Sequence, residues 1–524
     1  MPATLRVRRS LSSRHLPLVP TLAAGGMAVA VVRAGAAALG AVGAASWLTL
    51  ALAHRDDLYR IGFAQGVWLE LIRDASHGVL YPPLFDGQHF GGTRYMPLVP
   101  SLMGGVARLV HDELLAGRLV TSVFGVLLAA LVYRILARER VPFPTRVFLL
   151  GVLAILLADD TLTLHGDLPS VVLQLGALAL VARSTRTPWL AAAGASCALA
   201  LFAKATAVWG AAAILVWLLL HARAQVSRFL AAFLLPLAAL VTATAIGTDG
   251  RFVENMVALG DAGTPPLGTV LRYAAGIEGS PLQRALGYLG ATGLVLVVLA
   301  ALRLALAIAG RRLSIYDVAL VPAALVSAAA LLDIGATSNH LADVEVVAAV
   351  CVGLLATRRG AVSVRDRSAL ELVLLLVLAW PALVGYQLSL RKPTAEAIHL
   401  LAGRADTRYA LARLRPLVPQ RGDVLSEDPT VPFAAGRRPV VLDPFMLLRI
   451  GEQRPDWRAA LVRRIERRSF ARVYLLGRID ASSRGWYRDY DLGLPVVDAI
   501  QRAYRYAGVS QGYATYLPRA GRPV

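Results

Sequence analysis

Two adjacent carboxylates, Asp56 and Asp57, stand in the segment "AHRDDLYR", directly after the first long apolar run of the chain. A carboxylate at this place, partly removed from water, can act as a general base on a substrate whose lipid tail lies in the bilayer. An aspartate at a helix boundary also serves as an ordinary cap or interfacial residue. The pair alone therefore leaves a catalytic and a structural interpretation open.

The segment "HGVLYPPLFDGQHFGGTRYMPLVP", residues 77–100, collects Pro, Gly, Tyr, His and Arg in one short stretch. Three of its side chains, His89, Arg94 and Tyr95, are of the types that bind anions or stack on sugars. The composition predicts a shaped binding loop. The alternative is a loop in which Gly and Pro only turn the chain.

A second acidic group, Asp159, Asp160 and Asp167, occurs together with His165 in "LLADDTLTLHGDLPS". On the same membrane face as the first pair, this group can bind a divalent cation or orient an acceptor hydroxyl. The spacing does not single out a metal site, and a solvated loop also explains most of these residues.

Lys204 is the least ordinary single residue, because it follows an apolar stretch in "ALALFAKATAVWG". A cation inside such a stretch costs about 2.5–3.5 kcal/mol unless it snorkels or finds a partner. An anionic ligand head group is the functional interpretation of this lysine. A snorkelling side chain that marks the helix end is the structural one.

The segment "GATSNHLADVEV" brings Asn339, His340 and Glu345 to the start of a late apolar run. Glu345 stands about one turn into that run, where an unpaired carboxylate is costly, so we expect it to have a partner or to line a cavity. Capping and exposure to solvent suffice to explain Asn339 and His340.

Membrane helices are predicted to position these residues. Of the 524 residues, 56% are hydrophobic and 17% are charged, which is too apolar for one soluble globule. Since one span needs about 20 apolar residues, the chain holds about eleven spans. They are predicted at residues 27–53, 118–136, 146–158, 168–182, 189–203, 205–220, 229–246, 286–308, 315–333, 341–356 and 369–390.

The distribution of arginine predicts the orientation. The formal net charge is +20, and Arg-rich segments alternate along the chain with segments that carry Asp, Glu, His and Asn. By the positive-inside rule, the basic N-terminal arm lies in the cytoplasm and the acidic segments lie outside. The charge thus reports topology rather than nucleic-acid binding. We expect a multi-pass protein of the cell membrane whose first span is retained and not cleaved as a signal peptide.

Two of the outer segments are long. The first, residues 54–117, contains apolar residues at helical spacing over 62–78 and 97–115, which predicts two amphipathic helices at the membrane interface. The second, residues 247–287, is rich in Gly and Pro and is predicted to form a lid.

The composition changes near residue 391. Residues 1–390 are predicted to form the transmembrane domain and residues 391–524 an extracytoplasmic α/β domain, with helices at 407–418 and 456–470 and strands at 423–428, 438–444 and 471–477. The two cysteines, Cys197 and Cys351, lie inside apolar runs and are expected to be core thiols. No phosphate-binding loop, dinucleotide fingerprint or His/Cys metal cage is evident in the sequence.

Taken in order, these segments resemble the GT-C superfamily of integral membrane glycosyltransferases, the group that includes lipid A aminoarabinose transferases and protein O-mannosyltransferases. The resemblance covers most of the membrane region. It lies in "HRDDLYR" after the first span, "RYMPLVPSLMGG" near the end of the long outer loop, "HGDLPS" at the fourth span, "ALFAKATAVWG" between the fifth and sixth, and "SNHLADVE" before a late span.

The resemblance implies an inverting transfer of a sugar from a polyprenyl-phosphate donor to a cell-envelope acceptor on the extracytoplasmic face. An acidic residue of the first outer loop acts as base in such families, which by position points to Asp56, with Asp57 as the alternative. Lys204, Arg94 and His89 would offset the charge of the donor phosphate.

The resemblance also implies an acceptor side. Asp159, Asp160 and Asp167, with His165, would shape the acceptor or metal side, and Asn339, His340 and Glu345 would line a further part of the pocket. No nucleotide or redox cofactor is required, and a divalent metal is compatible with the reaction. The implied partners are the lipid-linked sugar, a glycan, lipid or protein acceptor, and the bilayer, with no nucleic acid.

The alternative is a non-enzymatic transporter or lipid flippase. Transporters tend to place charged residues at the bilayer midplane, in broken helices and often within internal repeats. This sequence instead collects such residues on one face of the membrane and adds an exterior domain, which favours the enzyme.

Overall fold

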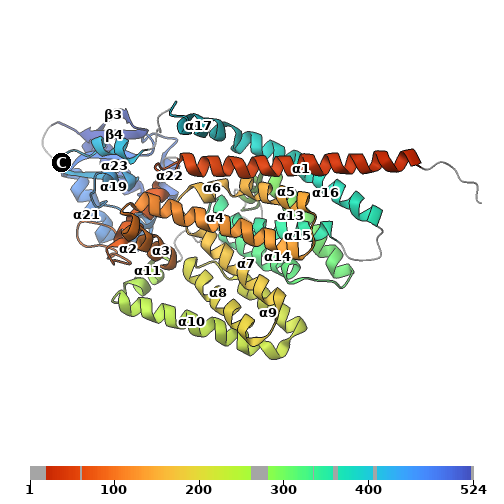
Figure 1. The fold of residues 1–524 in the computed structure, drawn as a ribbon. Coiled ribbons are helices and arrows are strands. Elements are labelled where there is room, and N and C mark those ends of the chain that lie inside the picture. The colour runs from red at the N-terminus through yellow and green to blue at the C-terminus, as the bar shows by residue number, and fades with distance from the viewer. Residues whose placement is uncertain are drawn as a thin grey trace, which may run out of the picture.

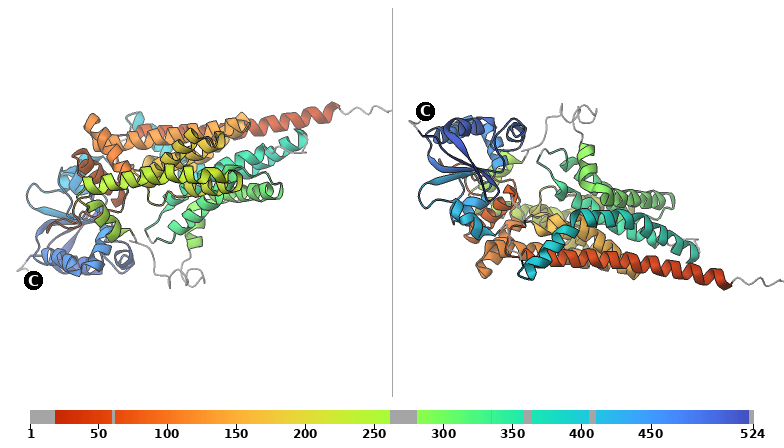
Figure 2. Two further views of the ribbon diagram at one scale, coloured as in Figure 1. Left: turned by 90° about the horizontal axis from the view of Figure 1, so that it is seen from below. Right: turned by 90° about the horizontal axis from the view of Figure 1, so that it is seen from above.

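The computed structural model describes residues 19–59, 62–260, 281–333, 335–357, 364–404 and 410–520. These residues form a long helical body with a small α/β domain at one end (Figure 1). The α/β domain stays at that end in the two perpendicular views (Figure 2). The helices of the body are α1 (Val19–Ala53), α2 (Phe63–Ser76), α3 (Leu98–Val110), α4 (Glu113–Arg138), α5 (Phe143–Leu156), α6 (Ala158–Leu162), α7 (Asp167–Arg183), α8 (Thr187–Ala203), α9 (Trp209–His221), η1 (Arg223–Gln225), α10 (Val226–Gly247), α11 (Arg251–Leu259), α13 (Pro281–Ala309), α14 (Ile315–Ala330), η2 (Ser338–Leu341), α15 (Ala342–Ala356), α16 (Val364–Ser389) and α17 (Arg391–Leu401).

The fold is that of a multi-pass α-helical membrane protein, as the sequence predicts. Within the described ranges, six helical stretches are long and apolar enough to cross a bilayer, and shorter apolar helices accompany them. All eleven predicted spans fall on helices of the structure. The number of eleven crossings stays a prediction, because several of these helices are short. The six long stretches are Met27–Ala53, Glu113–Arg138, Arg223–Gly247, Gln283–Ala309, Ser338–Ala356 and Ser368–Ser389.

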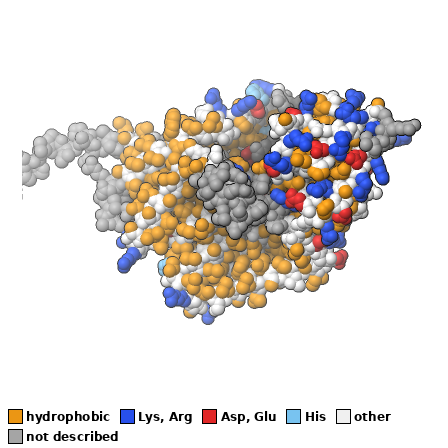
Figure 3. Space-filling model, turned by 180° about the vertical axis from the view of Figure 1, so that it is seen from behind, with side chains coloured by type: hydrophobic (Ala, Val, Ile, Leu, Met, Phe, Trp, Pro, Cys, Tyr) orange, Lys and Arg blue, Asp and Glu red, His pale blue; other side chains and the backbone are white. Residues whose placement is uncertain are grey.

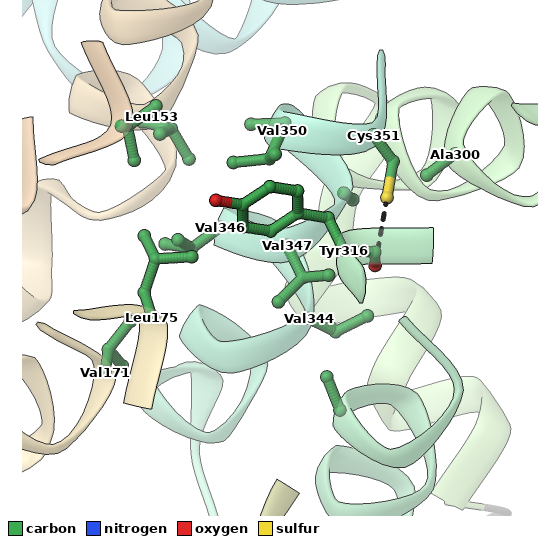
Figure 4. Close-up of a cluster of buried hydrophobic side chains, with 14 of the residues drawn as sticks. Leu153, Val171, Leu175, Ala300, Tyr316, Val344, Val346, Val347, Val350 and Cys351 are labelled. Atoms are coloured by element: carbon green, nitrogen blue, oxygen red, sulfur yellow. Dashed lines mark hydrogen bonds between the residues drawn. The ribbon is translucent and has the colours of Figure 1, made fainter. Parts of the chain in front are cut away.

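Helix α15 is the centre of the helical body. Every residue of this helix is buried, which fits a sequence that is apolar on all sides after its first turn. Val346 and Val350 pack among Leu153 of α5, Leu175 of α7 and Tyr316 of α14 (Figure 4). The same core holds both cysteines as free, buried thiols, which confirms that prediction.

The outer surface of the helical body is apolar. The space-filling view shows hydrophobic side chains over the helices, while charged side chains gather at the end that holds the α/β domain (Figure 3). Helix α10 illustrates the lipid-facing character, because Phe229 is its one buried residue while Leu235 remains 70% exposed. An exposed apolar surface of this extent marks a membrane-embedded region.

Helices α1, α5 and α16 are joined by a polar contact within this apolar body. Arg33 of α1 forms an ion pair with Glu371 of α16, whose side chain is only 3% exposed. Thr145, in the first turn of α5, donates a hydrogen bond of 2.6 Å to the other oxygen of Glu371. The carboxylate is therefore satisfied on both sides, as a buried charge requires.

The C-terminal domain is built on a four-stranded sheet with the order β1-β2-β4-β3. Strands β1 and β2 are parallel, whereas β4 runs antiparallel to both β2 and β3. Helices cover the sheet and share a core with it that includes Phe470, Val473 and Ile500. The elements are α18 (Leu411–Leu414), η3 (Arg415–Leu417), β1 (Asp423–Ser426), α19 (Thr430–Ala434), α20 (Pro444–Gln453), α21 (Pro455–Glu466), β2 (Phe470–Leu475), α22 (Arg484–Asp489), α23 (Leu494–Ala503), β3 (Tyr504–Ser510) and β4 (Tyr513–Pro518).

The prediction of an α/β domain is confirmed, but one predicted strand is wrong. Residues 438–444 form no strand, and only Val441 pairs, through a single parallel bridge, with Phe90 of the long outer loop. The partner of this apolar run therefore comes from a distant part of the chain and not from the sheet. The predicted helix at 456–470 and the strands at 423–428 and 471–477 coincide with α21, β1 and β2.

The long outer loop and the C-terminal domain dock on each other. Helix α2 is buried between α3, α4 and α19, and Gly66 of α2 faces Thr430 of α19 so closely that no side chain fits there. Helix α11 joins the same end of the molecule, because Gln453 of α20 donates a hydrogen bond to the carbonyl of Ala258. Both predicted outer segments therefore lie beside the C-terminal domain. Of the predicted lid at 247–287, residues 261–280 lie outside the described residues.

Candidate active site

The centre of the candidate site is an ion pair between Lys204 and Asp167. Asp167 is the first residue of α7, and Lys204 follows the last residue of α8, where an extended backbone ends the helix. Their side chains are 7% and 13% exposed, respectively. Asn339 donates a hydrogen bond of 3.0 Å to the second oxygen of Asp167. Three of the residues singled out in the sequence are thus in direct contact.

Further predicted residues surround this pair. Asp160, buried in α6, lies within electrostatic range of Asp167, Glu345 and Lys204. His340 of η2 lies within range of Asp167, Lys204 and His165. The structure therefore gathers the acidic segment after α5, the lysine after α8 and the polar start of α15 at one place. Asp159 is half-buried beside Asp160 in α6.

The first turn of α15 supplies two buried carboxylates to this cluster. Asp343 accepts a hydrogen bond of 2.7 Å from the indole nitrogen of Trp209, the first residue of α9. Glu345 is 4% exposed, and its carboxylate stands against Gly293 of α13. Glu345 is thus buried one turn into the helix, and a partner or a cavity for its carboxylate stays a prediction. With these residues the cluster contains more acidic than basic side chains.

Three buried polar atoms near Lys204 have no hydrogen-bond partner among the residues that the structure describes: the hydroxyl oxygen of Thr206, Nδ1 of His340 and the indole nitrogen of Trp68. Thr206 follows Lys204 by two residues, and the Trp68 ring lies against Gly166 at the start of α7. Buried polar groups are nearly always paired in folded proteins. These atoms are therefore available to the polar groups of a ligand.

Arg94 links this cluster to the C-terminal domain. Its guanidinium forms an ion pair with Asp333, which follows α14, and stands 5.4 Å from the ring centroid of Phe445 in α20. Tyr95, the next residue, is electrostatically coupled to Asp167, Asp333 and Arg94. The outer loop, the helical body and the C-terminal domain thus meet at this arginine.

Asp443 lies at the same junction as the N-cap of α20, where its side chain accepts hydrogen bonds from the backbone amides of Phe445 and Met446. Burial raises the pKa of this carboxyl to about 6, although the amides and Arg94 oppose that rise. Asp443 therefore becomes charged at a higher pH than most exposed aspartates do.

The two adjacent aspartates after α1 have opposite environments. Asp56 is exposed, with 70% of its side chain in contact with solvent, and pairs with its neighbour Arg55 at 2.9 Å. Asp57 is 1% exposed. Both of its oxygens lie 2.9–3.0 Å from Nδ1 of His54, and Oδ1 also accepts a hydrogen bond from the amide of Tyr59. The loop between α1 and α2 thus holds Asp57 rigidly and leaves Asp56 in solvent.

Arg118 of α4 lies beneath this loop and is itself buried. One of its terminal nitrogens donates to the carbonyl of Asp57 at 2.7 Å and to Gln65 of α2 at 3.4 Å. The contact ties the loop to the start of α4. Arg118 was not singled out from the sequence, because a cation one turn into a long apolar helix resembles an ordinary snorkelling residue.

His89 lies in a different groove from Lys204 and Arg94. The groove lies between the outer loop and the C-terminal domain and is also lined by Asp423, Arg437 and Arg438. His89 pairs with Asp86 at 3.1 Å. Partial burial opposes ionisation of Asp86, but hydrogen bonds from the amides of His89 and Gln88 lower its pKa to about 2. A phosphate role for His89 stays a prediction.

A second, very small pocket lies within the outer loop itself. It is lined mainly by apolar and aromatic side chains, including Leu71, Tyr81, Tyr95 and Pro100. Among the residues that the structure describes, no group of three or more His, Cys, Asp or Glu side chains is arranged to hold a metal ion.

Solved structures share this arrangement of helices and C-terminal domain. ArnT from Cupriavidus metallidurans in the apo state aligns with 91% of this chain and 96% of its own length, at a TM-score of 0.52 and 12% sequence identity. The same protein bound to undecaprenyl phosphate aligns with 92% and 97%, at a TM-score of 0.54 and 13% identity. The chain therefore has the fold of these ArnT structures. The sequence matches no protein-family model and no curated protein.

This shared fold explains why residues so distant in sequence converge. The segments that follow α1, α5, α8 and α14 all end on the side of the helical body that carries the C-terminal domain. Sequence reasoning missed His54, Asp333 and Asp443 as members of the site. His54 stands in the quoted segment "AHRDD", so its spacing to Asp57 was the available signal. No comparable signal exists for Asp333 and Asp443, because the residues that they contact lie far from them in the sequence.

Proposed function

We propose that this protein is a membrane glycosyltransferase that moves a sugar, with inversion, from a polyprenyl-phosphate donor to a cell-envelope glycan, lipid or protein on the extracytoplasmic face. The observation that carries the proposal is the Lys204–Asp167–Asn339 contact, set beneath the Arg94 junction in a chain of this fold. The solved neighbour that binds undecaprenyl phosphate supports a polyprenyl carrier as the lipid partner.

The two cations are suited to the leaving group. When the bond between sugar and phosphate breaks, negative charge develops on the polyprenyl phosphate, and a cation fixed beside it lowers the barrier. Lys204 and Arg94 each have a carboxylate partner, which holds the cation in position before substrate arrives. An incoming phosphate then shares a cation whose location is already set.

The acidic residues are suited to the sugar and acceptor. Asp160, Asp167 and Glu345 lie close enough to interact electrostatically, and the unpaired atoms of Thr206, His340 and Trp68 add hydrogen-bonding groups. A sugar or an acceptor hydroxyl can use both kinds of group. Proton removal from that hydroxyl falls to the acidic loop after α1, which contains Asp56 and Asp57.

The proposed topology has the N-terminus in the cytoplasm and the C-terminal domain outside. It is supported by the grouping of both long outer segments with the C-terminal domain at one end of the body, because the positive-inside rule assigns these segments to the extracytoplasmic side. The division of the chain at residue 390 belongs to the same proposal.

The test is a transfer assay with the purified protein in lipid vesicles. A panel of radiolabelled polyprenyl-phosphate sugars is combined with envelope acceptors, and both labelled product and released polyprenyl phosphate are measured. Lys204→Ala is expected to weaken donor binding and to reduce transfer. Lys392→Ala is the matched control, because the only other lysine of the chain is exposed on α17 and pairs there with Glu396.

Equal effects of Lys204→Ala and Lys392→Ala on transfer would contradict the phosphate role. If the wild-type protein moves polyprenyl phosphates between leaflets without transferring any sugar, the flippase alternative replaces the transferase. A fluorescently labelled polyprenyl phosphate in the same vesicles measures that movement directly.

A further inference from the structure

We propose that His54 is the catalytic base of the transfer and that Asp57 is the residue that positions it. The inference rests on the proposed function and changes the assignment of the proton acceptor. The structure motivates it through one contact: Nδ1 of His54 lies 2.9 and 3.0 Å from the two oxygens of Asp57.

Asp57 is poorly placed to accept a proton from a substrate. The residue is 1% exposed, and its oxygens already receive hydrogen bonds from His54 and from the amide of Tyr59. Its carbonyl is held by Arg118. A general base must reach the proton that it removes, directly or through one water. His54, by contrast, keeps 9% of its surface exposed.

The contact also fixes the tautomer of the imidazole. An ionised Asp57 can only accept, so Nδ1 of His54 carries the hydrogen and Nε2 presents a free lone pair. The two nitrogens lie on opposite sides of the ring, which directs Nε2 away from Asp57. None of the described residues forms a hydrogen bond with Nε2. This pairing of an oriented imidazole with a buried carboxylate is a recurrent way to build a base.

The surrounding chain holds the His54–Asp57 pair in place. His54 directly follows α1, and its amide donates to the carbonyl of Leu50. Tyr59 adopts a left-handed backbone with φ of 61°, which turns the loop back so that its ring packs edge-on against His54 at 4.9 Å. Such a conformation is costly for a residue with a side chain and is typical of a constrained functional loop.

Helix α1 also reaches the rest of the candidate site. The indole nitrogen of Trp47, two turns before His54, donates a hydrogen bond of 2.6 Å to Thr161 of α6. Thr161 is the neighbour of Asp160, which belongs to the Lys204 cluster. Helix α1, which His54 directly follows, is thus hydrogen-bonded to α6, which contains Asp160.

The proposed step balances as follows. The O–H bond of the acceptor hydroxyl breaks and its proton passes to Nε2 of His54, while the acceptor oxygen forms a bond to the anomeric carbon of the sugar. The bond between that carbon and the phosphate oxygen breaks, and polyprenyl phosphate leaves with the electron pair. Asp57 remains ionised and stabilises the imidazolium, which then releases its proton to water.

Among the residues that the structure describes, the charged and titratable groups around the imidazole come from its own loop and from α4. Asp57 and Tyr59 face it from the same loop, Arg118 holds the loop from α4, and the Arg55–Asp56 pair stands beside it in solvent. A general base acts only in its unprotonated form, so kcat/KM of the wild-type enzyme should fall on the acid side of its pH profile.

The experiment compares His54→Gln, His54→Asn and Asp57→Asn in the vesicle assay. Loss of a general base lowers the rate by about 100-fold or more, so each variant should lose at least that factor in kcat. His54→Asn keeps an amide that can donate to Asp57 but supplies no base. Binding of undecaprenyl phosphate should stay at the wild-type level, and residual activity of His54→Gln should lack the acid limb. His111→Gln, an exposed histidine before α4, is the matched control.

A variant that folds poorly is handled by chemical rescue. Added 4-methylimidazole should restore part of the activity of His54→Ala, whereas a base-free ring such as pyrrole should not. If the wild type transfers sugar and His54→Gln keeps its rate or its acid limb, the assignment of His54 is overturned while the proposed function stands. If the wild type transfers no sugar at all, the proposed function fails first and the assignment fails with it.

Discussion

Lys204, just after the end of α8, forms an ion pair with Asp167, the first residue of α7. Only 13% of the lysine side chain and 7% of the aspartate side chain are exposed. Breaking a buried pair from one side typically costs about 3–5 kcal/mol, because the remaining charge is left uncompensated. We therefore expect Lys204→Ala to lower the melting temperature in detergent as well as to impair transfer. The melting curve of Lys392→Ala should coincide with that of the wild type.

The double variant Lys204→Gln/Asp167→Asn separates these two effects. Removing both charges leaves no buried ion behind, so its melting temperature should lie above that of Lys204→Ala. Sugar transfer should remain lost. A double variant that is no more stable than the single one would show that the pair does not couple in the folded protein.

Asp57→Asn and Asp56→Asn should differ strongly, although the two residues are neighbours. Asp57 is buried and engaged by His54 and Tyr59, so an amide in its place disturbs the hydrogen bonding of the whole loop. Asp56 forms only an exposed pair with Arg55, a kind of contact worth about 0–1 kcal/mol. Transfer rates and melting temperatures of both variants test this. A larger loss of transfer in Asp56→Asn would return the role of base to that residue.

Asp443 predicts a pH dependence of stability. Its pKa is raised from 3.8 to about 6 by burial, so between these values the folded state binds more protons than the unfolded state. Stability contributed by this group is therefore greatest at low pH and falls as pH rises toward 6. Asp443→Asn keeps a good helix cap but cannot ionise. Its advantage over the wild type should grow from zero near pH 4 to at most about 3 kcal/mol above pH 6.

Melting temperatures in detergent at several pH values between 4 and 8 measure this advantage. Asp480→Asn provides a comparison, because that aspartate is exposed in the same domain and hydrogen bonds from Ser482 and Ser483 lower its pKa. A wild type whose stability rises from pH 4 to pH 6 relative to Asp443→Asn would contradict the prediction.

Gly66→Ala should loosen the contact between the outer loop and the C-terminal domain. A methyl group at Gly66 would lie 2.5 Å from the amide nitrogen of Thr430 and 2.7 Å from a carboxylate oxygen of Asp428. Backbone atoms cannot yield easily, so overpacking should cost about 1–3 kcal/mol. Hydrogen exchange of α2 and α19 should increase. In Gly105→Ala, the control in α3, the methyl group meets nothing within 4 Å and should be neutral or stabilising.

The membrane fold was largely predictable from the sequence. Apolar length fixes where a helix can cross a bilayer, and each predicted span falls on a helix, including the central α15. The C-terminal sheet was predicted less well. The run around Val441 has the composition of a strand, yet its backbone pairs once with Phe90, a contact that depends on how two distant segments dock. The hairpin of β3 and β4 was not predicted.

Part of the candidate site was predictable because membrane topology sorts residues by face. That sorting placed Asp160, Asp167, Lys204 and Glu345 on one side, and the structure brings these four together. It could not separate Asp56 from Asp57, since the difference between them is a matter of loop conformation. Membrane topology also could not predict the ion pair of Lys204 with Asp167, because a contact between two helix ends depends on how the helices pack.

The contact of Arg33 with Glu371 has a consequence for how the protein is made. During synthesis α1 is made long before α16. Arg33 therefore has no access to Glu371, which lies 338 positions later in the sequence, until most of the chain has been synthesised. When Glu371 arrives, insertion of its helix is favoured by a cation already present. Truncated chains that end before α16 should therefore leave Arg33 without this carboxylate, and their first helix should be held less stably in the membrane.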